Sequence, residues 1–242
     1  MILTIFITTA VIAYLLGSVN SSIIMSKLVF HADIRNSGSG NAGATNMLRT
    51  YGKKAGVFTL VGDMLKGLIA VLIGVLAERI IFWHTDPQSV YETGLSTLQF
   101  AFVFGKPQNN AILKYLVPAI PYAAGFFVMV GHIFPVFFKF RGGKGVATAA
   151  AVILSFDWRI GVAVISAALI VMAVSKYVSL GSVIGAAAYP LITLGVLISS
   201  YSYKNLLHFV FALLIAALCI IKHISNIKRL MRGEENKLGK HE

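Results

Sequence analysis

Glycines alternate with hydroxyl, amide and guanidinium side chains in the segment 37–49, SGSGNAGATNMLR. Three glycines fall within six residues, so the backbone can turn sharply and point several N–H groups inward, as in nests that bind anions. The neutral donors and the one planar cation suit a phosphate group. The segment therefore predicts an anion site, and a flexible solvated loop is the alternative. The residues expected to form the site are Ser39, Gly40, Asn41, Gly43, Thr45, Asn46 and Arg49.

A second glycine-rich segment, RGGKGVAT at 141–148, places a lysine among three glycines just before an apolar stretch. The glycines permit close backbone approach, and the N-terminus of a helix that follows them would attract an anion. The spacing is not that of a Walker A loop, and Val146 stands where that loop has Ser or Thr. A phosphate cradle is one interpretation, and a tight positive turn is the other. The cradle would consist of Gly142, Gly143, Lys144 and Gly145.

The third polar block lies near the C-terminus. His223 and Asn226 are three residues apart, so they would share one face of a helix at the membrane surface. The alternative is a basic amphipathic tail that lies on anionic lipid. We favour this alternative for Lys228, Arg229 and Arg232, and it fits His223 and Asn226 less well.

Other polar residues stand inside or beside apolar segments. Asp63 and Lys66 are three apart in the first turns of an expected span, where a mutual ion pair would explain them. Ser179 and Ser182 flank the start of another span, where helix capping is the structural explanation. For His132, two interpretations remain: a hydrogen bond to a carbonyl at the end of a helix, or a catalytic role.

The composition indicates a membrane protein. Of 242 residues, 57% are hydrophobic and 12% are charged, and the mean hydropathy is +0.80, so a soluble domain would lack the charge to cover its surface. Long apolar runs with few charges predict transmembrane helices. We expect an all-α polytopic protein with about seven of them, in a single domain over 1–242. The predicted segments are about 2–28, 55–82, 117–138, 146–156, 160–175, 180–200 and 206–222.

The distribution of charge predicts the orientation. The formal net charge is +12, and most of the 21 Lys and Arg residues follow the first and third apolar segments or lie in the tail. The positive-inside rule places these parts and the C-terminus in the cytoplasm, and the N-terminus outside. It accounts for the positive charge better than a nucleic-acid partner does. The segment 146–156 is shorter than the roughly 17–25 residues of a full crossing, so it either crosses a thinned site or is re-entrant.

Three further features complete the expected organisation. The N-terminal apolar run has no basic n-region, so we expect a retained first span rather than a signal peptide. The segment 83–116 is polar and interrupted, which predicts an external loop with a short interfacial helix, and 223–242 would be a cytoplasmic tail. Cys219 is the only cysteine, so no disulfide forms within the chain. No metal site and no cofactor are expected.

Six motifs follow one another along the chain: GSGNAGATNMLR, GKKAG, DMLKG, GHIFPVFFKFRGGKGVAT, KYVSLGS and HISNIKRLMRGEEN. Together they resemble the bacterial acyl-phosphate:glycerol-3-phosphate acyltransferase (PlsY) family over nearly the whole length. The resemblance implies seven spans and an active site on the cytoplasmic face of the inner membrane. It also implies acyl transfer from acyl phosphate to the sn-1 hydroxyl of glycerol 3-phosphate, which yields lysophosphatidic acid and phosphate for phospholipid synthesis. An acyl-phosphate-forming enzyme would act upstream.

The resemblance also assigns residues through the matching motifs. The catalytic residues it implies are Ser39, Arg49, Lys144, His223 and Asn226. The substrate-binding residues would be Gly40, Asn41, Gly43, Thr45, Asn46, Gly142, Gly143, Gly145, Ser179 and Ser182. The structural residues would be Asp63, Lys66 and Glu235. The segment 83–116 departs from the pattern, because it is longer than the family's usual connection.

The expected chemistry agrees with the residues. An acyl phosphate is an activated mixed anhydride, so no covalent nucleophile is required, and no Ser-His-Asp arrangement is visible. Cations and preorganised N–H donors can hold two phosphates and stabilise the oxyanion and the departing phosphate. Either His223 or a phosphate group of a substrate could act as the base that takes the hydroxyl proton. No His here has an Asp five residues further on, which argues against the acyl-CoA families with a His-x4-Asp pair.

Other classes of membrane protein compete with this interpretation. A transporter for a phosphorylated solute would also use anion-binding loops, but it would need polar residues at mid-membrane, which are sparse. A metal-dependent phosphatase or phosphotransferase would need clustered carboxylates, and Asp33 is the only acid in the first two cytoplasmic loops. A scaffold would make no use of the glycine-rich blocks.

Overall fold

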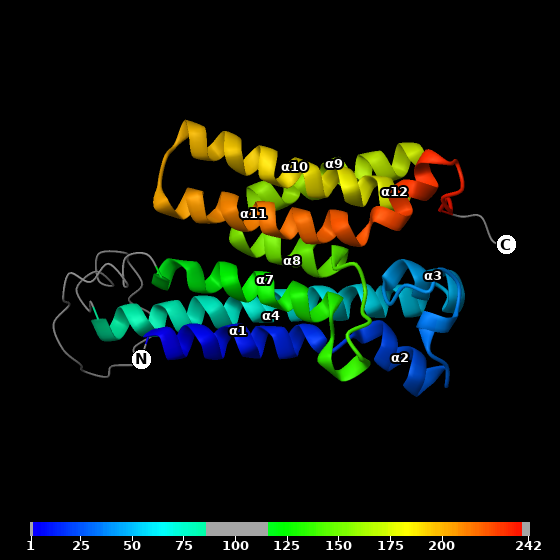
Figure 1. Cartoon of the computed structure of the whole chain (residues 1–242), viewed down its shortest axis with the longest axis horizontal. Coiled ribbons are helices and arrows are strands. Elements are labelled where there is room, and N and C mark those ends of the chain that lie inside the picture. The colour runs from blue at the N-terminus through cyan, green and yellow to red at the C-terminus, as the bar shows by residue number, and fades with distance from the viewer. Residues whose placement is uncertain (1, 86–115, 239–242) are drawn as a thin grey trace.

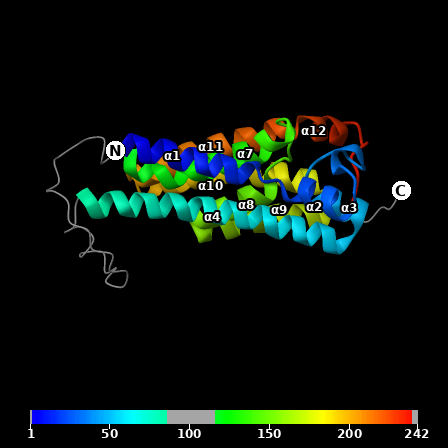
Figure 2. The same cartoon turned by 90° about the horizontal axis from the view of Figure 1, so that it is seen from below.

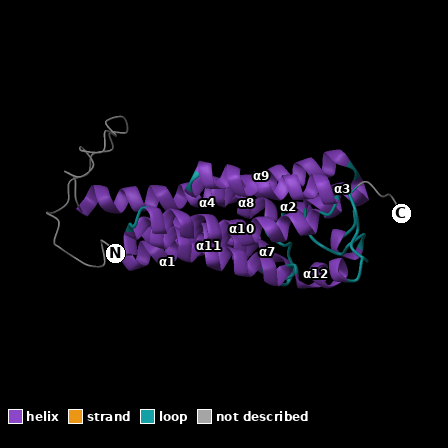
Figure 3. Ribbon diagram, turned by 90° about the horizontal axis from the view of Figure 1, so that it is seen from above, coloured by secondary structure: helices purple, strands orange, loops and turns teal. Residues whose placement is uncertain are grey.

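In the computed structural model, helices laid along one axis form an elongated bundle (Figure 1, Figure 2). The structure describes residues 2–85 and 116–238, in which every regular element is a helix (Figure 3). The expected all-α fold is therefore confirmed. The α-helices are α1 (Ile2–Ser18), α2 (Ser21–Val29), α3 (Ala44–Tyr51), α4 (Lys53–Thr85), α7 (Ile120–Ile133), α8 (Val146–Phe156), α9 (Trp158–Ser175), α10 (Val178–Ser199), α11 (Tyr203–Lys222) and α12 (Ile224–Met231).

Six segments of the described chain are long and apolar enough to span a bilayer. They are Ile2–Val29, Lys53–Trp83, Val117–Phe138, Trp158–Ser175, Val178–Ser199 and Tyr203–Lys222. The seventh expected segment, α8, has 11 residues, which corresponds to about 16 Å of helix against a hydrocarbon core of about 30 Å. It lies within the bundle beside α4, α7 and α9. By length alone, the count is six spans and one shorter apolar helix.

The first expected span is divided in two. α1 ends at Ser18, and Asn20 begins α2 by accepting the N–H of Ile23 at 3.1 Å and the hydroxyl of Ser22 at 2.7 Å through its side-chain oxygen. An amide that caps a new helix satisfies N–H groups that the break exposes. The capping side chain of Asn20 is the physical reason for this break within a run that otherwise looks like one apolar segment.

α1 and α7 approach closely because each has a glycine at the crossing. A Cβ built on Gly17 would lie 2.1 Å from the carbonyl oxygen of Val128, and one built on Gly131 would lie 2.1 Å from that of Tyr14. Only residues without a side chain allow two backbones to meet at this distance, as in other membrane helix pairs. This contact fixes the end of α7, from which the glycine-rich α7–α8 loop departs.

The segment 83–116 differs at its edges from the expected loop. α4 continues to Thr85, and residue 116 is again helical. Residues 86–115, which would hold the expected interfacial helix, lie outside the described residues. α4 also begins earlier than expected, at Lys53, so Asp63 and Lys66 lie about three turns into the helix rather than in its first turns.

One end of the bundle collects the short elements. α2, α3 and α12 lie together at the end opposite to that where α1 begins (Figure 1, Figure 2). α3 was not expected from the sequence. It begins after Gly43 and ends at Gly52, whose φ of 85° is a left-handed conformation that favours glycine. The three polar blocks of the sequence therefore meet at one end of the molecule.

Candidate active site

A cavity of about 620 Å³ lies at this end of the bundle. Part of its wall is polar, and the rest is made of apolar side chains, among them Leu60, Met64, Ile165, Leu169 and Met172. The sequence-predicted residues that line it are Ser39, Asn41, Gly43, Thr45, Asn46, Arg49, Asp63, Lys144, Gly145, Ser179, Ser182, His223, Asn226 and Glu235. The predicted residues outside its lining are Gly40, Lys66, Gly142 and Gly143.

A chain of polar contacts joins the cationic residues of the cavity. Lys144 Nζ donates a hydrogen bond to Asn226 Oδ1. Asn226 Nδ2 donates to Glu235 Oε1 at 2.7 Å, and Arg229 Nε donates to Glu235 Oε2 at 2.8 Å. Glu235 therefore orients the amide of Asn226 and pairs with Arg229. Arg229 lines the cavity, which the amphipathic-tail interpretation of this residue did not anticipate.

The protein environment changes the ionisation of two groups in this chain. Burial lowers the pKa of Lys144 to about 8, while the Glu235 carboxylate acts in the opposite direction. The amine is therefore still mostly charged at neutral pH, but close to its titration. Burial disfavours the ionised form of Glu235, yet the hydrogen bonds from Asn226 and Arg229 hold the pKa of this carboxyl below its usual value.

His223 connects α11 and α12 and is 2% exposed. Its Nδ1 lies 2.7 Å from the carbonyl oxygen of Cys219. A carbonyl oxygen can only accept, so Nδ1 carries the proton and Nε2 is left as an acceptor. Burial lowers the pKa of His223 to about 4, so the ring is neutral at pH 7. The ring thus has the tautomer and charge state of a proton acceptor.

The first glycine-rich loop is closed around Asn46, which is 1% exposed. Asn46 Nδ2 donates to the carbonyl oxygens of Ile34 (3.2 Å), Ser37 (2.9 Å) and Asn41 (3.0 Å). Asn46 Oδ1 accepts the N–H of Ser39 at 2.9 Å. The amide of Asn46 is occupied by the loop itself, so it holds the loop in shape instead of offering a free donor.

Two glycine N–H groups of the same loop already have acceptors within it. The N–H of Gly40 donates to Ser37 at 3.0 Å, and that of Gly43 donates to Asn41 at 3.1 Å. Backbone donors with internal partners are not available to an anion. Gly40 and Gly43 therefore shape the loop. The side chains of Ser39, Asn41, Thr45 and Arg49 line the cavity together with the start of α3, where the N–H groups of Ala44 and Thr45 have no acceptor within the described residues.

The second glycine-rich loop is fastened to the last turn of α7. The N–H of Gly142 donates to the carbonyl of Ile133, and the N–H of Gly143 donates to that of His132, each at 3.2 Å. A Cβ on Gly142 would lie 2.0 Å from the His132 carbonyl oxygen. These two glycines therefore permit close packing of the loop, and they do not form an open cradle.

The N–H groups of this region that have no acceptor within the described residues lie after the two glycines, at the start of α8. Gly145, with φ of 81°, precedes α8, and Val146 and Ala147 of its first turn line the cavity. The first N–H groups of a helix have no partner within it, and the helix dipole favours an anion there. The start of α8 and Lys144 together make the part of this segment that suits a phosphate.

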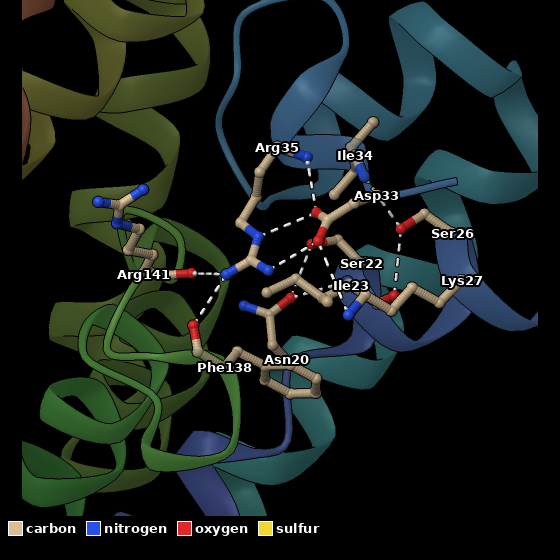
Figure 4. A network of polar contacts seen from close by, with 10 residues as sticks. All are labelled: Asn20, Ser22, Ile23, Ser26, Lys27, Asp33, Ile34, Arg35, Phe138 and Arg141. Carbon is tan, nitrogen blue, oxygen red and sulfur yellow. Dashed lines mark hydrogen bonds and ion pairs between the residues drawn. The ribbon is translucent and has the colours of Figure 1, made fainter. Parts of the chain in front are cut away.

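Arg35 ties the first loop to the second (Figure 4). Its Nη1 donates to the carbonyl oxygens of Phe138 at 2.8 Å and Arg141 at 3.1 Å, and its Nη2 pairs with Asp33 Oδ2 at 2.7 Å. The hydrogen bond from Arg35 lowers the pKa of Asp33 to about 2. Sequence reasoning missed Arg35, because a lone Asp-x-Arg pair in a basic loop has no distinctive pattern.

The C-terminal segment after α12 borders the cavity through Glu235 and Asn236. Arg49 Nη2 donates to the carbonyl oxygen of Asn236 at 3.1 Å, and the N–H of Leu238 donates to that of Lys176 at 2.8 Å. The segment thereby joins α3 to the turn between α9 and α10. Asn236 also borders a second hollow of about 1000 Å³ between α3 and the segment 233–238.

The remaining predicted residues lie on α10 and α4. Ser179 and Ser182 are buried on α10 and line the cavity, and Ser182 donates to the carbonyl of Val178 at 2.9 Å. The N-cap of α10 is Tyr177, so neither serine is its cap. Lys66 Nζ lies 2.9 Å from Asp63 Oδ1. Within residues 2–85 and 116–238, no three His, Cys, Asp or Glu side chains gather as metal ligands.

Comparison with known proteins decides the family. A profile of the family described as "Glycerol-3-phosphate acyltransferase" matches residues 7–233. The chain belongs to this family. A glycerol-3-phosphate acyltransferase of Clostridioides difficile (strain 630) is 38% identical over 234 residues, 97% of this chain and 96% of that protein. One from Coxiella burnetii (strain Dugway 5J108-111) is 37% identical over 233 residues, 96% and 98% of the two chains.

Solved structures of the family agree with the fold. A crystal structure of PlsY, an integral membrane glycerol 3-phosphate acyltransferase, in its glycerol 3-phosphate form has a TM-score of 0.71 and 31% identity. It covers 97% of this chain and 96% of its own. The lysophosphatidic acid form has a TM-score of 0.68, 29% identity and coverage of 97% and 95%. The family resemblance expected from the motifs is confirmed, and so is the integral membrane acyltransferase class.

Proposed function

We propose that this acyltransferase moves a fatty acyl group from acyl phosphate to the sn-1 hydroxyl of glycerol 3-phosphate. The products are lysophosphatidic acid and inorganic phosphate. The observation that carries the proposal is the mixed lining of the cavity. Its lining combines cationic and hydroxyl side chains with aliphatic side chains of α4 and α9, so one cavity suits both phosphates and a fatty chain.

The chemistry needs positioning and charge more than a nucleophilic side chain. The sn-1 oxygen forms a bond to the acyl carbon, the bond from that carbon to the phosphate oxygen breaks, and phosphate leaves with its electron pair. Lys144 and the N–H groups at the start of α8 can stabilise the oxyanion and the departing phosphate. Arg49 and Arg229 can hold the second phosphate, with Arg229 pre-set by Glu235.

The hydroxyl proton has two acceptors of suitable chemistry. Nε2 of His223 is one, because Cys219 fixes the ring in the tautomer that leaves this nitrogen unprotonated. A phosphate oxygen of a substrate is the other. Among the described residues that line the cavity, Asp63 and Glu235 are the only carboxylates, and both already contact a cation.

The proposal includes the setting of the reaction. The basic loops point to a cytoplasmic active site in the bacterial inner membrane, with seven crossings if α8 is counted, an external N-terminus and a cytoplasmic C-terminus. An enzyme that forms acyl phosphate would supply the donor, and the surrounding lipid would receive the product. No cofactor is needed for this transfer.

The test uses purified protein in lipid or detergent with glycerol 3-phosphate and either palmitoyl phosphate or palmitoyl-CoA. The proposal expects phosphate and sn-1 lysophosphatidic acid in equal amounts from palmitoyl phosphate alone. Product from palmitoyl-CoA alone would contradict the donor, and acylation at sn-2 would contradict the regiochemistry. Uptake of labelled glycerol 3-phosphate into proteoliposomes, without product from either donor, would favour a transporter.

A further inference from the structure

A buried polar cluster of three residues lies beside the cavity. Asp63, Lys66 and His132 are at most 7% exposed, and Asp63 and His132 line the cavity. The cluster joins α4 to α7, so it lies within the membrane-embedded part of the bundle. Ionisable groups in such a place are costly and are usually paired or functional.

Lys66 has partners for its three donors. Its Nζ lies 2.9 Å from Asp63 Oδ1, and it donates to the carbonyl oxygens of Gly17 at 3.2 Å and Val19 at 3.0 Å. These carbonyls belong to the break between α1 and α2, where the helical acceptors are exposed. Lys66 therefore has a structural explanation: it satisfies the broken helix and fixes the carboxylate of Asp63.

His132 has no such complete explanation. Its Nδ1 faces Asp63 Oδ1 at 3.6 Å, longer than a hydrogen bond, and it has no hydrogen-bond partner within the described residues. The opposite edge of the ring lies under the second glycine-rich loop, since a Cβ on Gly143 would be 2.2 Å from His132 Nε2. The main-chain carbonyl of the same residue accepts the N–H of Gly143 at 3.2 Å.

We propose that Asp63 and His132 are positioning residues that fix the Gly142–Gly145 turn and thereby aim Lys144 into the cavity. Lys66 holds Asp63, Asp63 faces the ring of His132, and the ring and carbonyl of His132 support Gly143, whose neighbour is Lys144. Substrate binding in the cavity would tighten the 3.6 Å contact, as polar contacts in sites without substrate commonly do. The inference rests on the proposed role of Lys144 in acyl transfer.

The test compares variants that keep the size of the side chain but change its polar groups. His132→Phe keeps a ring without nitrogen atoms. His132→Asn keeps a donor near the position of Nδ1, toward Asp63, and His132→Gln places its amide nearer to Nε2. The matched control is His208→Phe, because His208 is also a buried histidine, bonded to Tyr189 at 2.9 Å, and does not line the cavity.

A misplaced catalytic group loses on the order of 10²-fold in rate, so kcat of His132→Phe should fall roughly 10–100-fold with a nearly unchanged KM for glycerol 3-phosphate. His132→Asn should recover more of kcat than His132→Gln, and His208→Phe should keep wild-type kcat. Adding Asp63→Asn to His132→Phe should cost no further kcat, because the two residues act in series.

Wild-type kcat in folded His132→Phe would overturn the inference. If that variant fails to fold, equal kcat values for His132→Asn and His132→Gln would overturn it instead. Thermal unfolding of every variant is measured beside that of His208→Phe, so a loss of fold is not counted as a loss of positioning. Failure of the proposed role of Lys144 has a different signature, which is full activity in Lys144→Ala, and failure of the proposed function would appear as no product from palmitoyl phosphate in the wild-type protein.

Discussion

The two glycine-rich loops, 37–49 and 141–148, differ in where their hydrogen-bond donors go. In the first, the N–H groups of Ser39, Gly40 and Gly43 donate to acceptors inside the loop, and the side-chain amide of Asn46 donates to loop carbonyls. In the second, the glycines bond to the end of α7, while Lys144 and the start of α8 remain directed at the cavity. Both segments look like anion sites by composition. In each, two glycine N–H groups already have acceptors, and the N–H groups without an acceptor among the described residues lie at the start of the following helix, α3 or α8.

This difference shows why donors have to be counted one by one. A buried N–H that already has an acceptor cannot bind a substrate phosphate without losing that bond. The first loop therefore contributes Arg49, polar side chains and the start of α3 on a frame held by Asn46, and the second contributes Lys144 and the start of α8. A change at Asn46, which holds the frame of the first loop, should mainly affect stability, and a change at Lys144 in the second loop should mainly affect the reaction.

The largest effect is expected for Lys144→Ala. Loss of a group that stabilises the transition-state charge should lower kcat/KM on the order of 10³-fold. The protein should remain folded, since Lys144 bonds to Asn226 at the edge of the cavity and not within the core. The matched control is Lys139→Ala, which removes an exposed lysine of the same loop and should leave the rate unchanged. Equal rates in both variants would remove Lys144 from the site.

The next effect concerns the first loop. Asn46→Leu removes bonds to three carbonyls and one N–H, and buried polar groups without partners cost about 1–3 kcal/mol each. We expect the free energy of unfolding to fall by about 3 kcal/mol, measured as a lower Tm. Asn41→Ala is the control, because the Asn41 side chain makes no hydrogen bond within the described chain. An unchanged Tm in Asn46→Leu would contradict the closed loop.

The pH dependence of kcat/KM should follow the ionisation of Lys144 in the second loop. Lys144 has a lowered pKa of about 8, and it acts as a cation, so kcat/KM should fall as the pH rises through about 8, roughly tenfold per pH unit above it. His223, with a pKa of about 4, stays neutral over this range. In the substrate complex, bound phosphate favours the charged amine, so the corresponding fall in kcat should move to higher pH. A flat profile from pH 7 to 10 would contradict this role.

The smallest effect is expected for Arg35→Lys. A lysine cannot reproduce the fork that reaches Phe138, Arg141 and Asp33 together. The charge is kept, so the α7–α8 loop should loosen without unfolding, and kcat should fall only several-fold. Steady-state kinetics beside Lys27→Ala checks this, because Lys27 contacts Asp33 at 3.8 Å but no loop carbonyl. An equal loss in both variants would assign the effect to charge alone.

Much of the fold follows from the sequence, because long apolar runs define helices almost residue by residue. The segment 117–138 was predicted with the bounds that the structure shows. The break at Asn20 and the helix α3 were missed, since each depends on local capping inside a segment with another overall pattern. The motifs identified most of the polar residues that line the cavity, because polar residues are rare in such a chain.

The parts of the site that were missed depend on contacts between distant segments. Arg35 donates to carbonyl oxygens about a hundred residues further along the sequence. Arg229 is held by a hydrogen bond to Glu235. The apolar wall from α9, including Leu169 and Met172, has no motif, because any membrane helix is rich in such residues. The accessibility of the N–H groups in the two loops is likewise a property of the folded backbone.

Hydrogen–deuterium exchange in lipid nanodiscs, with and without glycerol 3-phosphate, measures directly whether a substrate phosphate binds at the start of α8. Because the N–H groups of Ser39, Gly40 and Gly43 have acceptors within the loop, their exchange should already be slow in the free protein and should change little when the ligand binds. The account predicts new protection in the segment 144–148 when the ligand binds. New protection across 39–43 with none in 144–148 would contradict the account, because the first loop would then be the phosphate-binding nest.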